Sequence, residues 1–170
     1  MNFRKGTIND LDQLKELGVR SWTQYKDHLT DENWSELYAI LKSSDNYTEL
    51  LQVSECLICE DDYNQCIGMA FLVPNGNPTE IYDENWCHLR FVSVDPDYRG
   101  QGIGRELTQR CIEIALENNE QTMALHTAEI MGTAQHLYKK LGFRRYKEIK
   151  PALGVRYWLY LLDLSDYKSQ

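Results

Sequence analysis

The chain has 170 residues, of which 42% are hydrophobic, and its formal net charge at pH 7 is −8. This size fits a single domain over residues 1–170, and the negative charge disfavours nucleic-acid binding. No apolar run reaches the length of a membrane span, and the N-terminus lacks the apolar core of a signal peptide. We therefore expect a soluble, cytoplasmic protein with no membrane partner.

The negative charge is concentrated in one early segment. Residues 27–62 contain ten acidic residues and a single lysine, whereas the rest of the chain is nearly neutral. Two interpretations stay open: the solvated faces of two helices, or part of a site that attracts cations.

The five cysteines favour reduced, buried thiols, because their number is odd and no export signal is seen. Cys56 and Cys59 share a predicted strand, and a separation of three residues directs their side chains to opposite faces. They are therefore not expected to chelate one ion, and no metal site is predicted.

The first half of the chain predicts a strand, two helices and three strands. A strand over 2–6 precedes a helix that begins after Thr7 or Asn9 and ends near Tyr25, and a second helix runs from about residue 30 to a break at 43–46. Residues 47–53 add a helical turn. Strands over 55–60 and 66–73 form a hairpin, and a loop over 74–85, rich in proline and acidic residues, leads to a strand over 86–94.

The second half alternates helices and strands. It predicts a helix over 102–118, a strand over 122–126, a helix over 131–141 that ends at Gly142, and strands over 143–149 and 155–164. This order indicates an α/β fold in which the helix over 102–118 connects neighbouring strands by a right-handed crossover.

The junction between the strand over 86–94 and the following helix is rich in glycine. Gly100, Gly102 and Gly104 occupy alternate positions between Arg99 and Arg105. Glycines let backbone N–H groups approach a ligand, and the first turn of a helix offers unpaired donors, so the junction suits a phosphate or pyrophosphate. A nucleoside-triphosphate loop is excluded, because no Lys-Ser or Lys-Thr follows a glycine, and the G-x-G-x-G spacing fits a dinucleotide fingerprint poorly. A glycine-rich turn without a ligand is the remaining alternative.

Two motifs carry a resemblance to a known family. The pattern Arg99-x-x-Gly102-x-Gly104 after Val-x-Val resembles the coenzyme A loop of the GNAT family of N-acetyltransferases, and the stretch from Ala134 to Phe143 resembles the family signature A-x-x-L-Y-x-x-L-G-F. The resemblance implies the acyl-CoA N-acyltransferase (GNAT) fold, a mixed central sheet of about seven strands flanked by about four helices. It also implies acetyl-CoA as cosubstrate, no metal, and direct attack by a primary amine in a ternary complex.

The resemblance further implies which residues bind the cofactor. The pantetheine would lie along the fourth strand, where its amides can pair with an exposed strand edge, and the pyrophosphate would lie over the glycine loop. The implied cofactor-binding residues are Val92, Ser93, Val94, Arg99, Gly100, Gln101, Gly102, Ile103, Gly104 and Arg105.

Tyr138 matches the family tyrosine that protonates the departing thiolate, and a phenol can donate that proton. Packing on one helical face is its alternative role. His88 is a candidate general base, because it occupies the strand position where histone-type members of the family place theirs. The match is one of position only, so His88 is alternatively an ordinary strand histidine without a catalytic role. His126 and a water molecule are the other candidates for the base. Met131 stands where many members have Asn, and Thr127 is a candidate to replace that polar contact.

The acceptor is expected to lie between residues 19–52 and 74–86, by analogy with the family. Acidic and aromatic side chains in these regions favour a small cationic amine of polyamine, aminoglycoside or lysine type. Acetylation of protein N-termini or lysines is a second prediction, and a non-catalytic acyl-CoA sensor is a third. A homodimer is the default assembly, because symmetric dimers are the commonest.

Overall fold

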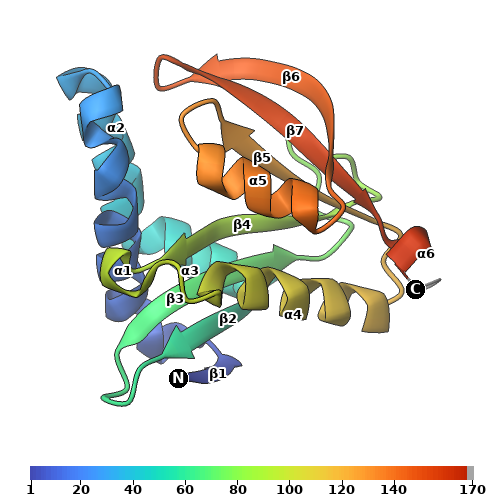
Figure 1. Cartoon of the computed structure of the whole chain (residues 1–170), viewed down its shortest axis with the longest axis horizontal. Coiled ribbons are helices and arrows are strands. Elements are labelled where there is room, and N and C mark those ends of the chain that lie inside the picture. The colour runs from blue at the N-terminus through green and yellow to red at the C-terminus, as the bar shows by residue number, and fades with distance from the viewer. Residues whose placement is uncertain (168–170) are drawn as a thin grey trace.

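The computed structural model describes residues 1–167, which form one seven-stranded sheet with helices on both faces (Figure 1). The strand order is β1-β2-β3-β4-β5-β7-β6, and the β4–β5 pair is parallel whereas the others are antiparallel. The strands are β1 (Asn2–Lys5), β2 (Glu55–Glu60), β3 (Cys66–Val73), β4 (Cys87–Val94), β5 (Thr122–Ala128), β6 (Arg144–Ala152) and β7 (Val155–Asp163). The mixed sheet of seven strands confirms the predicted fold class.

The described residues contain six α-helices rather than about four. They are α1 (Leu11–Trp22), α2 (Asp31–Lys42), α3 (Ser44–Val53), α4 (Ile103–Glu117), α5 (Gly132–Lys140) and α6 (Leu164–Tyr167). Three short 3-10 segments join them: η1 (Ile8–Asp10), η2 (Thr23–His28) and η3 (Pro96–Tyr98).

The break predicted after α2 is the start of another helix. Ser43 ends α2, and its side chain also accepts a hydrogen bond from the backbone N–H of Asn46, which caps α3. Serine is a favourable N-cap because it satisfies a donor that the helix itself leaves unpaired. The predicted single turn at 47–53 was therefore wrong, and the chain forms a full helix there.

Two hydrophobic clusters hold the helices on the sheet. One packs α4 and α5 against one face and includes Leu107 and Tyr138; the other packs α1 and α3 against the opposite face and includes Leu17 and Tyr47. In Figure 1, α4 and α5 lie in front of the sheet and α3 lies behind it. Cys56 belongs to the α1–α3 cluster and Cys59 to the α4 cluster, which confirms that the two thiols face opposite sides.

A third cluster closes one end of the molecule. Trp22, Tyr25 and Leu29, from the α1–η2 region, pack with Ala128 and with residues of β7. The tip of the β6–β7 hairpin reaches the same region, because a Cβ on Gly154 would lie 2.7 Å from the Asn33 side-chain nitrogen. The first two helices and the last hairpin thus meet beyond the ends of β4 and β5.

None of the helices in the described part of the chain is long and apolar enough to cross a bilayer.

Candidate active site

Strands β4 and β5 begin as paired neighbours and then separate. Their pairing is limited to Cys87 with Met123 and His88 with Ala124, although β4 continues to Val94. Beyond His88, the edge of β4 that faces β5 has no strand partner. Such an edge offers backbone N–H and C=O groups to an extended ligand that contains amides.

A β-bulge in β4 accompanies this separation. Met69 of β3 pairs with Ser93 and Phe71 pairs with Arg90, so two residues of β4 oppose one residue of β3. Phe91, one of these two, has a φ of 48°, in the left-handed region that a phenylalanine rarely adopts. Because a bulge bends its strand, it accounts for the divergence of β4 from β5.

The glycine loop after β4 is shaped as an anion site. Gly100 and Gly102 have φ values of 77° and 81°, and Gly102 is the N-cap of α4, whose first turn receives no side-chain cap. Within residues 1–167, the backbone N–H groups of residues 100–105 donate to no protein acceptor. A Cβ on Gly100 or Gly102 would meet nothing within 4 Å, so the space above the loop is open. These features fit the pyrophosphate of coenzyme A, with the strand edge of β4 available for its pantetheine.

The two arginines of the loop have different surroundings. The guanidinium of Arg99 donates to the side-chain oxygen of Gln24 at 2.9 Å and to the carbonyl of Ser21 at 2.8 Å, so it ties the loop to α1 and η2. Arg105 is exposed in the first turn of α4. Of the two, Arg105 has the freer guanidinium for a phosphate.

The other predicted cofactor residues lie around the same loop. Val92 and Val94 pack against the α4 cluster, and the Ser93 hydroxyl donates to the carbonyl of Phe91 at 3.3 Å. Gln101 is exposed and Ile103 is buried. Gly104 lies close to α5, because a Cβ there would be 3.8 Å from Leu137. The structure therefore brings the predicted loop, β4 and α5 together.

Tyr138 lies on α5 beside this loop. Its ring packs edge to face against Phe143 at a centroid distance of 5.7 Å, and its hydroxyl makes no hydrogen bond to any described residue. Burial, together with the nearby Tyr25 and Cys111, raises the pKa of the Tyr138 phenol above its ordinary value. The phenol is thus protonated at neutral pH, as a proton donor must be.

His88 and His126 lie on neighbouring strands with Tyr82 between them. The His88 ring stacks on the Tyr82 ring at 4.0 Å, and His88 is only 2% exposed. The Tyr82 hydroxyl is hydrogen bonded to Nδ1 of His126, which is more accessible than His88. Burial, followed by the charge of Arg90, lowers the pKa of each imidazole to about 4, so both are neutral at pH 7. No sequence pattern predicts the Tyr82–His126 contact, because Tyr82 lies in an irregular loop.

Thr127 and Met131 are both buried near the end of β5. The Thr127 hydroxyl has no hydrogen-bond partner within residues 1–167, whereas Met131 packs with Ala128 and Tyr157. An unpaired buried hydroxyl is costly, so a polar ligand atom beside Thr127 would be stabilising.

The acidic segment is divided by the fold. Glu60 pairs with Arg4 at 2.6 Å, and Asp61 accepts backbone hydrogen bonds within the β2–β3 turn, two strands away from β4. These acids stabilise the structure instead of lining the acceptor region. The acidic residues carried by η2 and α2 are Asp27, Asp31, Glu32 and Glu36.

The aromatic residues predicted for the acceptor region also separate into groups. Tyr25 packs in the cluster that includes Ala134 of α5, and Tyr82 contacts His88 and His126. Trp34 and Tyr38 instead form a pair on α2, and Trp86 packs on Tyr146 of β6. The tyrosines of the expected acceptor region that lie towards the candidate active site thus come from η2 and the loop before β4.

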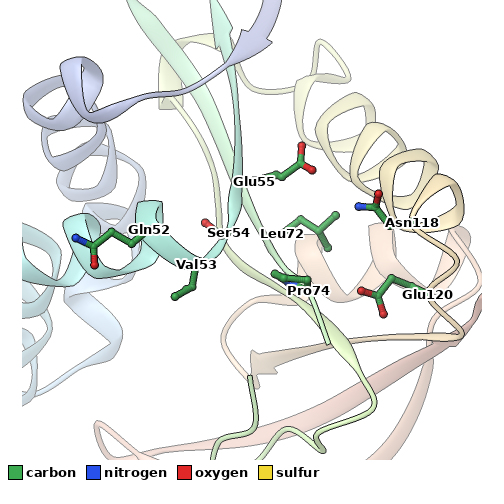
Figure 2. Close-up of a pocket in the computed structure, with 8 residues that line it drawn as sticks. All are labelled: Gln52, Val53, Ser54, Glu55, Leu72, Pro74, Asn118 and Glu120. Atoms are coloured by element: carbon green, nitrogen blue, oxygen red, sulfur yellow. The ribbon is translucent and has the colours of Figure 1, made fainter. Parts of the chain in front are cut away.

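A separate pocket of about 230 Å³ lies at the other end of α4 (Figure 2). Its side chains come from the end of α3, the start of β2, the end of β3 and the segment after α4. Because α4 has 15 residues, about 22 Å of helix separates this pocket from the glycine loop. The described residues contain no group of His, Cys, Asp and Glu side chains that could hold a metal ion.

Comparison with known proteins connects this geometry to a family. The sequence profile of the Acetyltransferase (GNAT) family matches residues 12–143. N-acetylaspartate synthetase from Danio rerio is 44% identical over 66 residues, which are 39% of this chain and 23% of that protein. N-acetyltransferase 8B from Homo sapiens is 28% identical over 129 residues, which are 76% of this chain and 52% of that protein. The chain thus spans about half or less of the length of these two relatives.

A solved structure shows the same fold. The crystal structure of PaiA N-acetyltransferase from Thermoplasma acidophilum in complex with coenzyme A matches with a TM-score of 0.78 and 19% identity, over 95% of this chain and 98% of that one. The fold agrees with the sequence profile, and that profile covers most of the chain. The chain therefore belongs to the GNAT family of N-acetyltransferases.

Proposed function

We propose that this chain transfers the acetyl group of acetyl-CoA to the primary amine of a small cationic acceptor, by direct attack in a ternary complex. The observation that carries the proposal is the Tyr138 hydroxyl, which is held on α5 beside the glycine loop without a protein hydrogen-bond partner in the described chain. N-acetylaspartate synthetase, by its name, makes an acetylated amino acid, which supports a small-molecule acceptor.

Acetyl-CoA would supply an activated thioester, held by the backbone N–H groups of residues 100–105, by Arg105 and by the free edge of β4. The acceptor nitrogen bonds to the acetyl carbon, the carbon–sulfur bond breaks, and Tyr138 gives its proton to the departing sulfur. The proton that the nitrogen loses passes to His126 or, through water, to solvent. We favour His126 over His88, because the His88 ring is enclosed in its stack with Tyr82.

A panel of amines tests this proposal, with release of the coenzyme A thiol as the measurement. At least one small cationic amine should release thiol, and Tyr138→Phe should lower kcat by roughly 10²-fold with little change in the KM for acetyl-CoA. Tyr63→Phe is the matched control, because Tyr63 is 87% exposed in the β2–β3 turn and should keep full activity.

Other outcomes separate the alternatives. Acetylation of peptides alone would indicate a protein acceptor. Acetylation of neutral or anionic amines alone would contradict the cationic acceptor. Thermal stabilisation by acetyl-CoA without thiol release from any amine would favour a non-catalytic sensor.

A further inference from the structure

Arg90 lies on β4 at the point where β4 and β5 separate. It pairs across the sheet with Phe71 of β3 and immediately precedes Phe91 of the bulge. Because side chains two residues apart share a face of a strand, Arg90 projects from the same face as His88. This position places a cation on the His88 face of β4, next to the point where β4 and β5 separate.

The guanidinium of Arg90 is not neutralised by the described protein. It makes no hydrogen bond and no ion pair within residues 1–167, and it lies over the Phe91 ring at 5.7 Å from the ring centroid. By contrast, Arg4 holds Asp10 and Glu60, and Arg20 holds Asp95 at 2.9 Å. A half-buried guanidinium with unfilled donors is suited to a bidentate anion.

The charge of Arg90 acts on the residues around the reacting centre. Burial lowers the pKa values of His88 and His126 and the charge of Arg90 lowers them further, whereas burial raises the pKa of Tyr82 and Arg90 opposes that rise. His88 shares a face of β4 with Arg90, and Tyr82 both stacks on His88 and is hydrogen bonded to His126, so these side chains from β4, β5 and the loop before β4 form one group on that face. An anion bound to Arg90 would lie beside the Tyr82–His126 hydrogen bond.

The phosphates of coenzyme A do not account for this arginine. Four residue steps along β4, or roughly 13 Å, separate Arg90 from Val94, and the glycine loop lies farther still. An anion that fills the free donors of Arg90 would therefore have to belong to the acceptor. The acceptor of the proposed reaction also carries the attacking amine, so it would have groups of both signs.

We propose that Arg90 binds a carboxylate of the acceptor, and that the chain acetylates amines that also carry a carboxylate, as amino acids do. This proposal rests on the acetyl transfer proposed above. It favours a lysine-type acceptor over a polyamine or an aminoglycoside, which have no carboxylate.

Matched pairs of amino acid and decarboxylated amine test the proposal: lysine with cadaverine, arginine with agmatine, and histidine with histamine. The wild-type protein should acetylate the amino acid of a productive pair with a kcat/KM roughly 10- to 100-fold higher, as expected for a charge-assisted contact. Arg90→Gln should remove this preference by raising the KM of the amino acid, and should leave the decarboxylated amine unchanged. Arg90→Lys should keep part of the preference, because it keeps the charge but not the paired donors.

Arg110→Gln is the matched control, because Arg110 pairs with Glu106 on the exposed side of α4 and should keep the wild-type preference. An equal or greater rate with the decarboxylated amines, or a preference that survives in Arg90→Gln, would overturn the carboxylate proposal while leaving acetyl transfer in place.

Failure of acetyl transfer itself would give no thiol release from any pair. Binding then remains a separate readout, measured as the change in melting temperature of the coenzyme A-bound protein. A stabilisation by amino acids that decarboxylated amines do not produce, and that Arg90→Gln abolishes, would support a carboxylate site. Equal stabilisation by both members of each pair would overturn it.

Discussion

Three buried side-chain polar atoms lack a partner within the described chain: the Tyr47 hydroxyl, Nδ1 of His88 and the Thr127 hydroxyl. His88 and Thr127 lie on β4 and β5, the two strands that separate, whereas Tyr47 lies on α3. A buried polar atom without a partner costs about 1–3 kcal/mol. Two of these costs thus fall on the strands of the candidate active site, and a polar ligand atom beside Thr127 can offset one of them.

His88 should make the stability of the protein depend on pH. Burial lowers the pKa of its imidazole from 6.5 to about 4, so the unfolded chain binds a proton at a higher pH than the folded chain does. The free energy of unfolding is therefore not reduced by His88 above pH 6.5, and it decreases as the pH falls from 6.5 towards 4. Between pH 7 and pH 5 the decline should be about 2 kcal/mol.

Urea unfolding at pH 7 and pH 5 measures this effect. His88→Phe keeps an aromatic ring to stack on Tyr82 but cannot titrate, so its free energy of unfolding should fall less than that of the wild type. His136→Phe is the control, because His136 is exposed on α5 and should leave the pH dependence as it was. Equal pH dependence in His88→Phe and the wild type would show that His88 is not the cause.

At the scale of elements, the loop and helix that follow β4 combine two requirements. The chain must turn with positive φ at Gly100 and Gly102, and it must leave the first N–H groups of α4 unpaired. Both requirements are visible in the sequence. Glycine is the residue that readily adopts a positive φ, and a helix start without a capping side chain leaves its first N–H groups unpaired. The bulge at Phe91 had no such signal, because phenylalanine there reads as an ordinary strand residue.

Gly102 has two proposed roles: it allows the chain to turn with a positive φ, and it leaves space for a ligand above the loop. Replacing it with alanine should affect both. A Cβ at a φ of 81° costs about 1 kcal/mol of stability, and a methyl group above the loop also obstructs a ligand. Gly76→Ala is the matched control, because Gly76 has a φ of 83° and open space around its Cβ but lies in the loop before β4.

Both variants should melt at a similarly reduced temperature. Only Gly102→Ala should also weaken coenzyme A binding, as measured by calorimetry. An unchanged affinity in Gly102→Ala would remove this glycine from the cofactor site.

At the scale of the whole molecule, local patterns predicted most of the elements and the glycine loop but not the packing around the expected acceptor region. The spacing of apolar residues predicted the strands and most helices, and glycines at 102 and 142 predicted where α4 begins and α5 ends. The expected acceptor region adjoins a cluster built from η2, β5, α5 and the β6–β7 hairpin, which are distant in sequence. Contacts such as Tyr82 with His126, and the absence of a partner for Arg90 in the described chain, depend on tertiary packing and leave no periodic signal.

Arg99 and the Arg20–Asp95 ion pair tie the glycine loop and the end of β4 to α1 and η2, which belong to the expected acceptor region. Arg99 bonds to Gln24 and to the Ser21 carbonyl, while Arg20 of α1 holds Asp95 at the end of β4 at 2.9 Å. Loss of Arg99 should therefore lower the stability of the protein even without coenzyme A. Loss of the exposed Arg105 should weaken only the binding of an anion.

Melting curves with and without coenzyme A test this difference between the two arginines. Arg99→Ala should lower the melting temperature of the free protein by roughly 2–4 °C, because charge-assisted hydrogen bonds between elements are lost. Arg105→Ala should melt as the wild type does when free but gain less stability from coenzyme A, and this deficit should shrink as salt screens the phosphates. If Arg99→Ala altered only the stabilisation by coenzyme A, Arg99 would act as a phosphate ligand. The link between the glycine loop and the expected acceptor region would then rest on Arg20 and Asp95 alone.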